Sequence, residues 1–299
     1  NILLQTYFGD VRDIYEDIIN KPFAGVGLDF NEGRKTFELV EKYGFSAGKL
    51  LFAGVVNGKN IWKNNYKKTL DLISSIKNAC DNNINVVIST SCSLLHVPYT
   101  LKHEDKLADS YKIHFSFAEE KLTELAELGV LADKKQDKVK SENAYIDNQK
   151  VFEEERNCHN AEVKERLANI KEEDYVRLPL RSERQKLQKE KLGLPEFPTT
   201  TIGSFPQTKE IKAERAAYRK NEISEEEYTQ YIKKQIADCV KWQEEIGLDV
   251  LVHGEYERND MVEYFGEALE GYLFTQKAWV QSYGTRCVKP SIRYLLQHV

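Results

Sequence analysis

Short apolar stretches alternate with amphipathic stretches along the first hundred residues. Four stretches have the length and apolar content of buried strands: 2–8, 24–30, 49–56 and 84–90. Three stretches between them place apolar residues at helical spacing: 11–19, 35–43 and 62–82. Strands that alternate with helices predict βα units around a parallel sheet. Because no Gly-x-Gly-x-x-Gly turn follows a strand, the pattern favours part of a (β/α)₈ barrel over a dinucleotide-binding fold.

The middle of the chain is helical and highly charged. Residues 115–128 form an amphipathic pattern, and residues 133–191 are dense in charges of both signs and poor in Gly and Pro. Such a run is typical of solvated helices with i,i+4 ion pairs, so we expect a helical connector rather than a binding tail. The stretch 192–198 contains one Gly and two Pro residues and predicts a boundary.

The strand and helix alternation resumes after residue 198. Apolar stretches at 198–203 and 247–252 predict strands, and the stretches 208–220 and 224–245 predict helices. Ser224 and Glu227 have the spacing of a capping box at the start of the longer helix. We therefore expect an α/β protein with three parts: one barrel region at 1–104, a helical linker at 105–197, and a second barrel region at 198–299.

Composition excludes several classes of protein. The 299 residues carry a formal net charge of −5 and have no basic stripe, which argues against a nucleic-acid partner. No apolar run reaches the length of a membrane span, and no secretory signal is present, so we expect a cytoplasmic protein. The five cysteines are widely spaced and include no Cys-x-x-Cys pair, which indicates reduced thiols and no zinc knuckle. Because the chain starts without Met inside a strand pattern, we interpret it as a fragment.

Polar groups follow the two late strands, where catalytic groups of barrel enzymes lie. Ile202-Gly203-Ser204 offers backbone amides and a hydroxyl, although an ordinary tight turn explains the same residues. Glu255 would bind an ammonium group or act as a base, or it would belong to a structural Glu–Arg network with Glu257 and Arg258. His253 is a structural histidine or a metal ligand, and it has no Cys or His partner at ligand spacing.

Two further stretches carry reactive groups. Arg286 has the forked geometry that suits a carboxylate ligand, and the adjacent Cys287 is either a nucleophile or a buried neutral thiol. In the first hundred residues, Cys92 and His96 lie at a strand end. They could form a catalytic pair, but we favour a strand-end turn with a satisfied histidine.

Together the late stretches resemble one enzyme family, the cobalamin-independent methionine synthases. The resemblance rests on Thr199-Thr-Thr-Ile-Gly-Ser-Phe-Pro-Gln-Thr208, on His253-Gly-Glu-Tyr-Glu-Arg-Asn-Asp-Met-Val-Glu-Tyr-Phe-Gly266 and on Trp279-Val-Gln-Ser-Tyr-Gly-Thr-Arg-Cys287. Gly54 to Trp62 and Ser89 to His96 resemble the end of that family's first barrel. From Ser291 onward we expect the sequence to depart from the family.

The resemblance implies two (β/α)₈ barrels joined by a helical linker. It implies methyl transfer from 5-methyltetrahydropteroyl-triglutamate to homocysteine, with a zinc ion that binds the substrate sulfur and without cobalamin. Ile202, Gly203, Ser204 and Glu255 would bind homocysteine, and Arg286 with Cys287 would contact the methyl-folate. The family's zinc ligands come later than this chain, so we assign no metal ligand and no catalytic residue, and His298 is not counted as one.

These expectations define the competing hypotheses. We expect the full-length enzyme to be a monomeric methyltransferase and this fragment to be inactive alone. One alternative is a non-catalytic protein that keeps the barrel loops and binds a ligand. Another is a related zinc methyltransferase with a different methyl donor. Turnover by this chain alone would contradict the fragment hypothesis.

Overall fold

The computed structural model describes residues 2–80, 84–133, 139–153, 160–282, 284 and 287–293. Contacts divide the chain into two compact units. The first unit comprises Asn1–Asn157 with Gly271–Val299, and the second unit comprises Cys158–Glu270. This division reflects contacts between residues and does not identify barrels. The expected boundaries near residues 104 and 197, which separate two barrel regions from a linker, therefore stay predictions.

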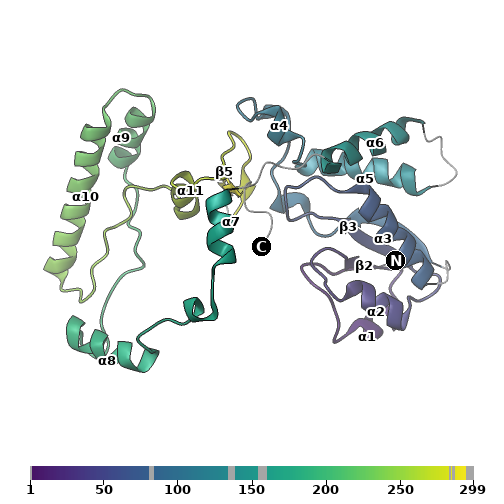
Figure 1. Cartoon of the computed structure of the whole chain (residues 1–299), viewed down its shortest axis with the longest axis horizontal. Helices are drawn as coiled ribbons and strands as arrows, with labels where there is room; N and C mark the ends of the chain where they lie inside the picture. Colours follow the sequence, from purple (N-terminus) through teal and green to yellow (C-terminus); the bar gives the residue numbers. More distant parts are fainter. Residues whose placement is uncertain are drawn as a thin grey trace. The chain divides into compact units, whose positions relative to one another are not determined.

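A four-stranded parallel sheet lies at the centre of the first unit (Figure 1). Its strands follow one another in chain order: β1 (Leu3–Gln5), β2 (Gly25–Asp29), β3 (Leu50–Val56) and β4 (Asn85–Thr90). The connections between them contain three helices: α1 (Tyr15–Asn20), α2 (Thr36–Tyr43) and α3 (Tyr66–Ala79). The predicted alternation is therefore confirmed, and the chain has a mixed α/β fold with a parallel sheet.

The sheet packs against helices through one apolar core. All five residues of β2 are buried, which is typical of a parallel strand covered on both faces. Val26, Leu51 and Ala53 of the sheet pack with Val40 of α2 and Ile76 of α3, and each of these side chains is fully buried. Burial of one Val, Leu or Ile side chain stabilises the folded state by about 1.5–3 kcal/mol. The apolar residues that recur at helical spacing in the sequence are those that face this core.

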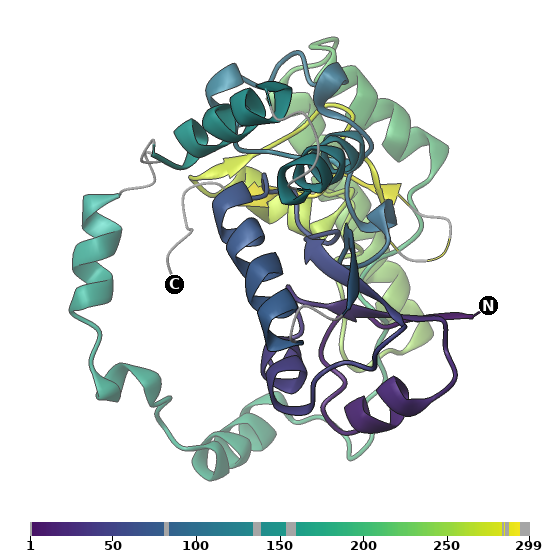
Figure 2. The same ribbon diagram turned by 90° about the vertical axis from the view of Figure 1, so that its right-hand side faces the viewer.

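Three helices pack together beside the sheet. After the short helices η1 (Leu94–His96), η2 (Leu101–His103) and α4 (Asp109–Lys112), the chain forms α5 (Ala118–Ala132) and α6 (Val139–Glu153). Helices α5 and α6 contact each other and α3 (Figures 1 and 2). Asn148 of α6 is buried; its Oδ1 accepts a hydrogen bond from the Tyr66 amide at 3.0 Å and its Nδ2 donates to the Asn64 carbonyl at 2.8 Å. Asn148 is thus a buried position within the charged stretch, whereas the residues of 161–170 are exposed, as expected of a solvated helix.

A buried ionisable pair lies on α5, one turn apart. The Lys121 side chain is fully buried and donates to the Trp62 carbonyl at 3.1 Å. Glu124 is buried as well, and its Oε1 accepts a hydrogen bond from the Asn64 amide at 2.9 Å. Burial lowers the pKa of Lys121 to about 8, although the nearby Glu124 opposes this shift. Burial also raises the pKa of Glu124 above its ordinary value.

This lysine predicts a pH dependence of stability. Between about pH 8 and pH 10.5, the folded protein has released the Lys121 proton that the unfolded chain still holds. The free energy of unfolding contributed by Lys121 therefore rises with pH in this window. Urea midpoints at about pH 8 and about pH 9.5 measure it, and Lys121→Met should abolish the rise. An equal rise in the variant would contradict this assignment.

The segment after residue 271 joins the first unit as two short antiparallel pairs. Strand β5 (Tyr272–Leu273) pairs with β8 (Ile292–Arg293), and β6 (Val280–Gln281) pairs with β7 (Cys287–Val288). Ala278 and Ile292 are buried in a second apolar cluster that contains Leu107, Phe115 and Phe117. The C-terminal part of the described chain is thus anchored to the residues that follow the parallel sheet.

The second unit is mainly helical. It contains α7 (Ala161–Ala168), η3 (Glu172–Tyr175), α8 (Arg181–Leu192), α9 (Lys209–Arg219), α10 (Glu225–Ile246) and α11 (Met261–Glu267). Helices α9 and α10 pack side by side (Figure 1). The predicted capping box is confirmed, because the Glu227 amide donates to Ser224 Oγ at 3.2 Å and the Ser224 amide donates to Glu227 Oε2 at 2.8 Å. No helix within the described ranges is long and apolar enough to cross a bilayer.

The two strands predicted in this unit are extended segments without a regular ladder. Segments 199–205 and 249–254 run parallel, and they share an isolated bridge between Ser204 and Gly254. The Thr199 amide and hydroxyl both donate to the Asp249 carboxylate at 2.8 Å, and the Thr200 hydroxyl donates to the Val250 carbonyl at 2.9 Å. Apart from the Val250 amide, which donates to the Thr199 carbonyl at 3.0 Å, these links run through side chains. The prediction of regular strands at 198–203 and 247–252 is therefore wrong.

Candidate functional site

Gly203 and Glu255 lie together where the two extended segments of the second unit end. Gly203 has φ +102°, and a Cβ atom placed on it would lie 3.1 Å from Glu255 Oε1. Next to this contact, the Phe205 amide donates to the Gly254 carbonyl at 2.9 Å. Glu255 itself has φ +58°, a left-handed conformation that costs a non-glycine residue free energy. The positive φ of Gly203 therefore favours glycine at this position, and the Glu255 carboxylate lies close to the Gly203 backbone.

An ion-pair network surrounds the Glu255 carboxylate. Arg258 Nη2 lies 2.7 Å from Glu255 Oε1, and Arg258 Nη1 lies 2.6 Å from Glu257 Oε1. His253 Nδ1 accepts the Glu255 amide at 3.2 Å and lies 3.5 Å from Glu257 Oε2. The predicted structural network thus exists, and His253 has a structural role within it. The Glu255 side chain nevertheless remains 26% exposed, so a small cation can reach it from solvent.

Two residues of the second unit support the loop that carries Glu255. Arg215 of α9 is 9% exposed, and its Nη2 donates to Gln207 Oε1 at 2.7 Å and to the Tyr256 carbonyl at 2.8 Å. Gln207 Nε2 donates to the Glu255 carbonyl at 3.2 Å. Sequence reasoning missed both residues. The available signal was the position of Arg215 one turn after Ile211, on the face of α9 that is buried.

The other side of the loop is closed by α10. The Gln243 side chain is fully buried; its Nε2 donates to the Val252 carbonyl at 2.7 Å and its Oε1 accepts the Val252 amide at 2.9 Å. Tyr256 lies against the buried Cys239, and burial raises the pKa of the Tyr256 phenol to about 12, so it stays neutral near pH 7. A Cβ atom on Gly254 would lie 2.6 Å from the Tyr256 ring, which excludes a larger residue there. The loop is thus held on both sides.

The remaining predicted site residues have different environments. The Ile202 side chain is 94% exposed, and Ser204 joins the bridge to Gly254. Cys287 belongs to the first unit, where it pairs with Gln281 and is exposed as a free thiol. The hypothesis that Cys287 is a buried thiol is therefore wrong. Arg286 and His298 lie outside the described residues.

The Cys92 and His96 pair does not form a catalytic arrangement. Cys92 is buried, and its burial raises the pKa of the thiol, which disfavours the nucleophilic thiolate. The His96 ring instead packs edge-on against Phe8, with ring centroids 5.0 Å apart. The strand-end turn is the better description, with His96 packed on the Phe8 ring.

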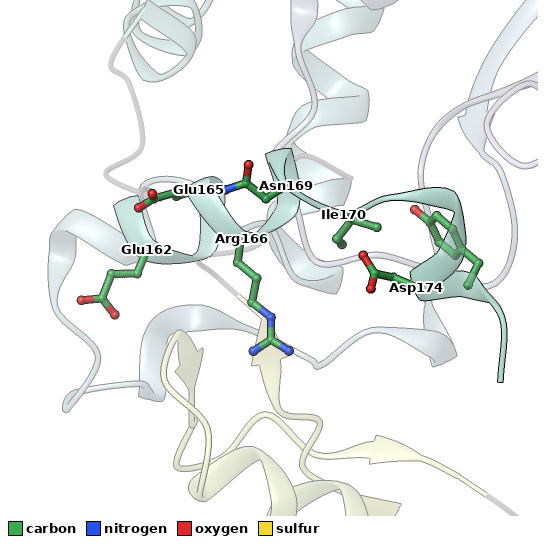
Figure 3. Close-up of a pocket in the computed structure, with 7 residues that line it drawn as sticks. Glu162, Glu165, Arg166, Asn169, Ile170 and Asp174 are labelled. Carbon is green, nitrogen blue, oxygen red and sulfur yellow. The ribbon is translucent and has the colours of Figure 1, made fainter. Parts of the chain in front are cut away.

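The described part of the second unit also contains a surface hollow, which differs from a typical ligand site. Among the residues that the structure describes, no three His, Cys, Asp or Glu side chains converge on one point. A hollow of about 750 Å³ lies along α7 and η3. Glu162, Glu165, Arg166 and Asp174 line it, and Figure 3 shows these exposed side chains spread along the helices. The hollow therefore lacks the convergent polar groups of a small-molecule site.

Comparison with family models links the chain to known proteins. Residues 197–295 match the model described as "Cobalamin-independent synthase, Catalytic domain". Residues 1–81 match the model described as "Cobalamin-independent synthase, N-terminal domain". The match to the catalytic-domain model continues to residue 295, so the departure from the family that we expected at Ser291 is wrong.

Close relatives carry one name, 5-methyltetrahydropteroyltriglutamate–homocysteine methyltransferase. The protein of Lactococcus lactis subsp. lactis (strain IL1403) is 54% identical over 292 residues, which cover 98% of this chain and 37% of the relative. The protein of Bifidobacterium adolescentis is 54% identical over 97% of this chain and 38% of the relative. The protein of Streptococcus sanguinis (strain SK36) is 52% identical over 97% of this chain and 37% of the relative. The chain thus spans less than two fifths of the length of these relatives.

Proposed function

Because this chain belongs to the family of cobalamin-independent methionine synthases, we propose that it acts within a longer homocysteine methyltransferase. The proposed reaction moves the methyl group of 5-methyltetrahydropteroyltri-L-glutamate to L-homocysteine and yields L-methionine. The homocysteine sulfur, as thiolate, attacks the methyl carbon; the S–C bond forms as the bond from carbon to the folate nitrogen breaks, and this nitrogen then takes up a proton. In this proposal the present chain binds and orients the substrates.

One observation carries the proposal: Gly203 and Glu255 meet at the ends of two adjoining extended segments, with Glu255 accessible. A carboxylate beside a glycine turn suits an α-amino acid, because the carboxylate would bind the ammonium group and backbone amides of the turn would bind the carboxyl group. We assign Ile202, Gly203, Ser204 and Glu255 to the amino-acid end of homocysteine. The protruding Ile202 would cover the bound aliphatic chain.

We assign the methyl-folate side to Arg286 and Cys287. Cys287 is exposed at the start of β7, where a ligand can contact it, and the neighbouring guanidinium would pair with a carboxylate of the folate. We also propose that β1 to β4 are the last strands of a first (β/α)₈ barrel and that the extended segments of the second unit begin another. Parallel order and chain-order adjacency support this reading, since barrel strands follow one another in this way.

The family resemblance implies a zinc ion, and the described residues of this chain do not supply a site for it. The described residues contain no cluster of three candidate ligands, so we derive no step through the metal. What this chain contributes to the proposed reaction is the placement of the amino acid and of the folate.

A methyl-transfer assay of the longer protein tests the proposed function. We expect methionine to form from homocysteine and 5-methyltetrahydropteroyltriglutamate, and we expect no turnover from the chain described here when it is assayed alone. Binding of either substrate without turnover by the longer protein would favour the non-catalytic alternative. Turnover with another methyl donor, but not with the folate, would favour the related methyltransferase.

A further inference from the structure

We propose that Glu104 is a positioning residue that fixes the segment carrying Cys287, a role that rests on the proposed function. Glu104 is 1% exposed and lies directly after η2 in the first unit. Its Oε2 accepts the Gln276 amide at 2.6 Å, and its Oε1 accepts the Lys277 amide at 2.7 Å. One carboxylate thus binds two consecutive backbone amides that lie more than 170 residues away in sequence.

This arrangement determines the register of the bound segment. Apolar packing of Ala278 and Ile292 in the second cluster favours burial of the segment, but such packing is non-directional and tolerates sliding. Two charge-assisted hydrogen bonds to adjacent amides add direction to this packing, because each carboxylate oxygen faces one N–H group. A shift by one residue would present a different pair of amides to Glu104 and would move Ala278 out of the buried cluster, so the two interactions together select one register.

The bound segment leads directly to the proposed folate side. From Lys277 the chain enters β6, which pairs with β7 so that Gln281 faces Cys287. Lys289, just after β7, donates back to the Thr275 carbonyl at 3.4 Å and closes the segment beside the Glu104 contact. The position of Cys287 therefore depends on a carboxylate that lies on the N-terminal side of the chain. This gives the first unit a task in the proposed reaction, namely to hold the folate-side strands in place.

Glu104→Gln tests the inference while it preserves side-chain size. Its amide presents an NH₂ group to one of the two backbone N–H groups, so one hydrogen bond is replaced by a repulsive contact. We expect hydrogen exchange at the Gln276 and Lys277 amides of this chain to accelerate about tenfold or more. In the longer enzyme we expect KM for the methyl-folate to rise about tenfold, with KM for homocysteine unchanged.

Glu119→Gln is the matched control, because Glu119 forms an exposed ion pair with Lys102 and should leave both readouts unchanged. Where Glu104→Gln does not fold, Glu104→Asp retains the charge and shortens the reach, and the same measurements apply. Unchanged exchange at both amides would overturn the inference. Faster exchange with an unchanged KM for methyl-folate would overturn it as well. A wild-type enzyme without turnover would instead refute the proposed function, and exchange would still show whether Glu104 holds the segment.

Discussion

Replacing Glu255 by glutamine in the longer enzyme is expected to lower kcat/KM for homocysteine by about 100-fold, mainly through KM. The variant keeps the size of the side chain and removes the negative charge that would pair with the substrate ammonium group. A hydrogen-bonded ion pair at a partly desolvated site contributes more than a neutral hydrogen bond, which accounts for the size of the loss. Steady-state kinetics with homocysteine varied at saturating methyl-folate measures this effect.

Glu257→Gln is the matched control for this prediction. Glu257 lies in the same loop and also pairs with Arg258, at 2.6 Å, but has no assigned contact with the substrate. We expect its KM for homocysteine to change by less than about threefold, since it loses only loop support. Equal losses in both variants would show that Glu255 acts through the ion-pair network. If higher homocysteine concentrations restored the rate of neither variant, a binding role for Glu255 would be contradicted.

Gly54→Ala is expected to lower the free energy of unfolding of the first unit by about 1–3 kcal/mol or more. A Cβ atom at this position of β3 would lie 2.7 Å from the Ser91 Cα atom, 2.9 Å from the Leu28 carbonyl oxygen and 3.2 Å from the Thr90 carbonyl oxygen. All three contacts are backbone atoms of neighbouring strands or turns, so no flexible side chain can move aside. These close contacts can be relieved only if β3 moves away from β2 and β4 at the centre of the sheet.

Urea unfolding monitored by tryptophan fluorescence measures this loss. Trp242 lies in the second unit, so a Trp242→Phe background leaves Trp62 and Trp279 as reporters of the first unit. Gly129→Ala is the control, because a Cβ atom in this exposed position of α5 meets nothing within 4 Å. Alanine there should stabilise the helix by about 0.5–1 kcal/mol. An unchanged midpoint for Gly54→Ala would contradict the close packing at β3.

Local patterns predicted the elements that depend on local interactions. Apolar periodicity indicated the strands and helices of the parallel sheet, because each element must present an apolar face to a common core. The sequence also predicted the capping box at Ser224 and Glu227, because both partners lie within one helical turn. The predicted strands at 198–203 and 247–252 did not form regular ladders. A ladder needs neighbouring strands, and side chains such as Asp249 compete for the same backbone groups.

The residues of the candidate site also fall into two groups, those that the sequence indicated and those that it did not. Sequence indicated Gly203 and Glu255, because polar groups that end parallel apolar segments converge at one edge. It did not indicate Arg215 or Gln207, whose partners are carbonyl groups more than 40 residues away. The position of Arg215 one turn after Ile211 indicates that it lies on the buried face of α9, but no local pattern shows which distant carbonyl groups it binds.

By itself, therefore, the sequence determined the alternation of helices and strands, the helix caps, the family and the residues at the strand ends. Only the tertiary structure decided which charged groups are buried and what they hold: Lys121 beneath the Trp62 carbonyl, Arg215 behind the Glu255 loop, and Glu104 on the Gln276 and Lys277 amides. The physical reason is that secondary structure follows from neighbours along the chain. Burial of a charge is instead allowed only where distant backbone groups replace its water.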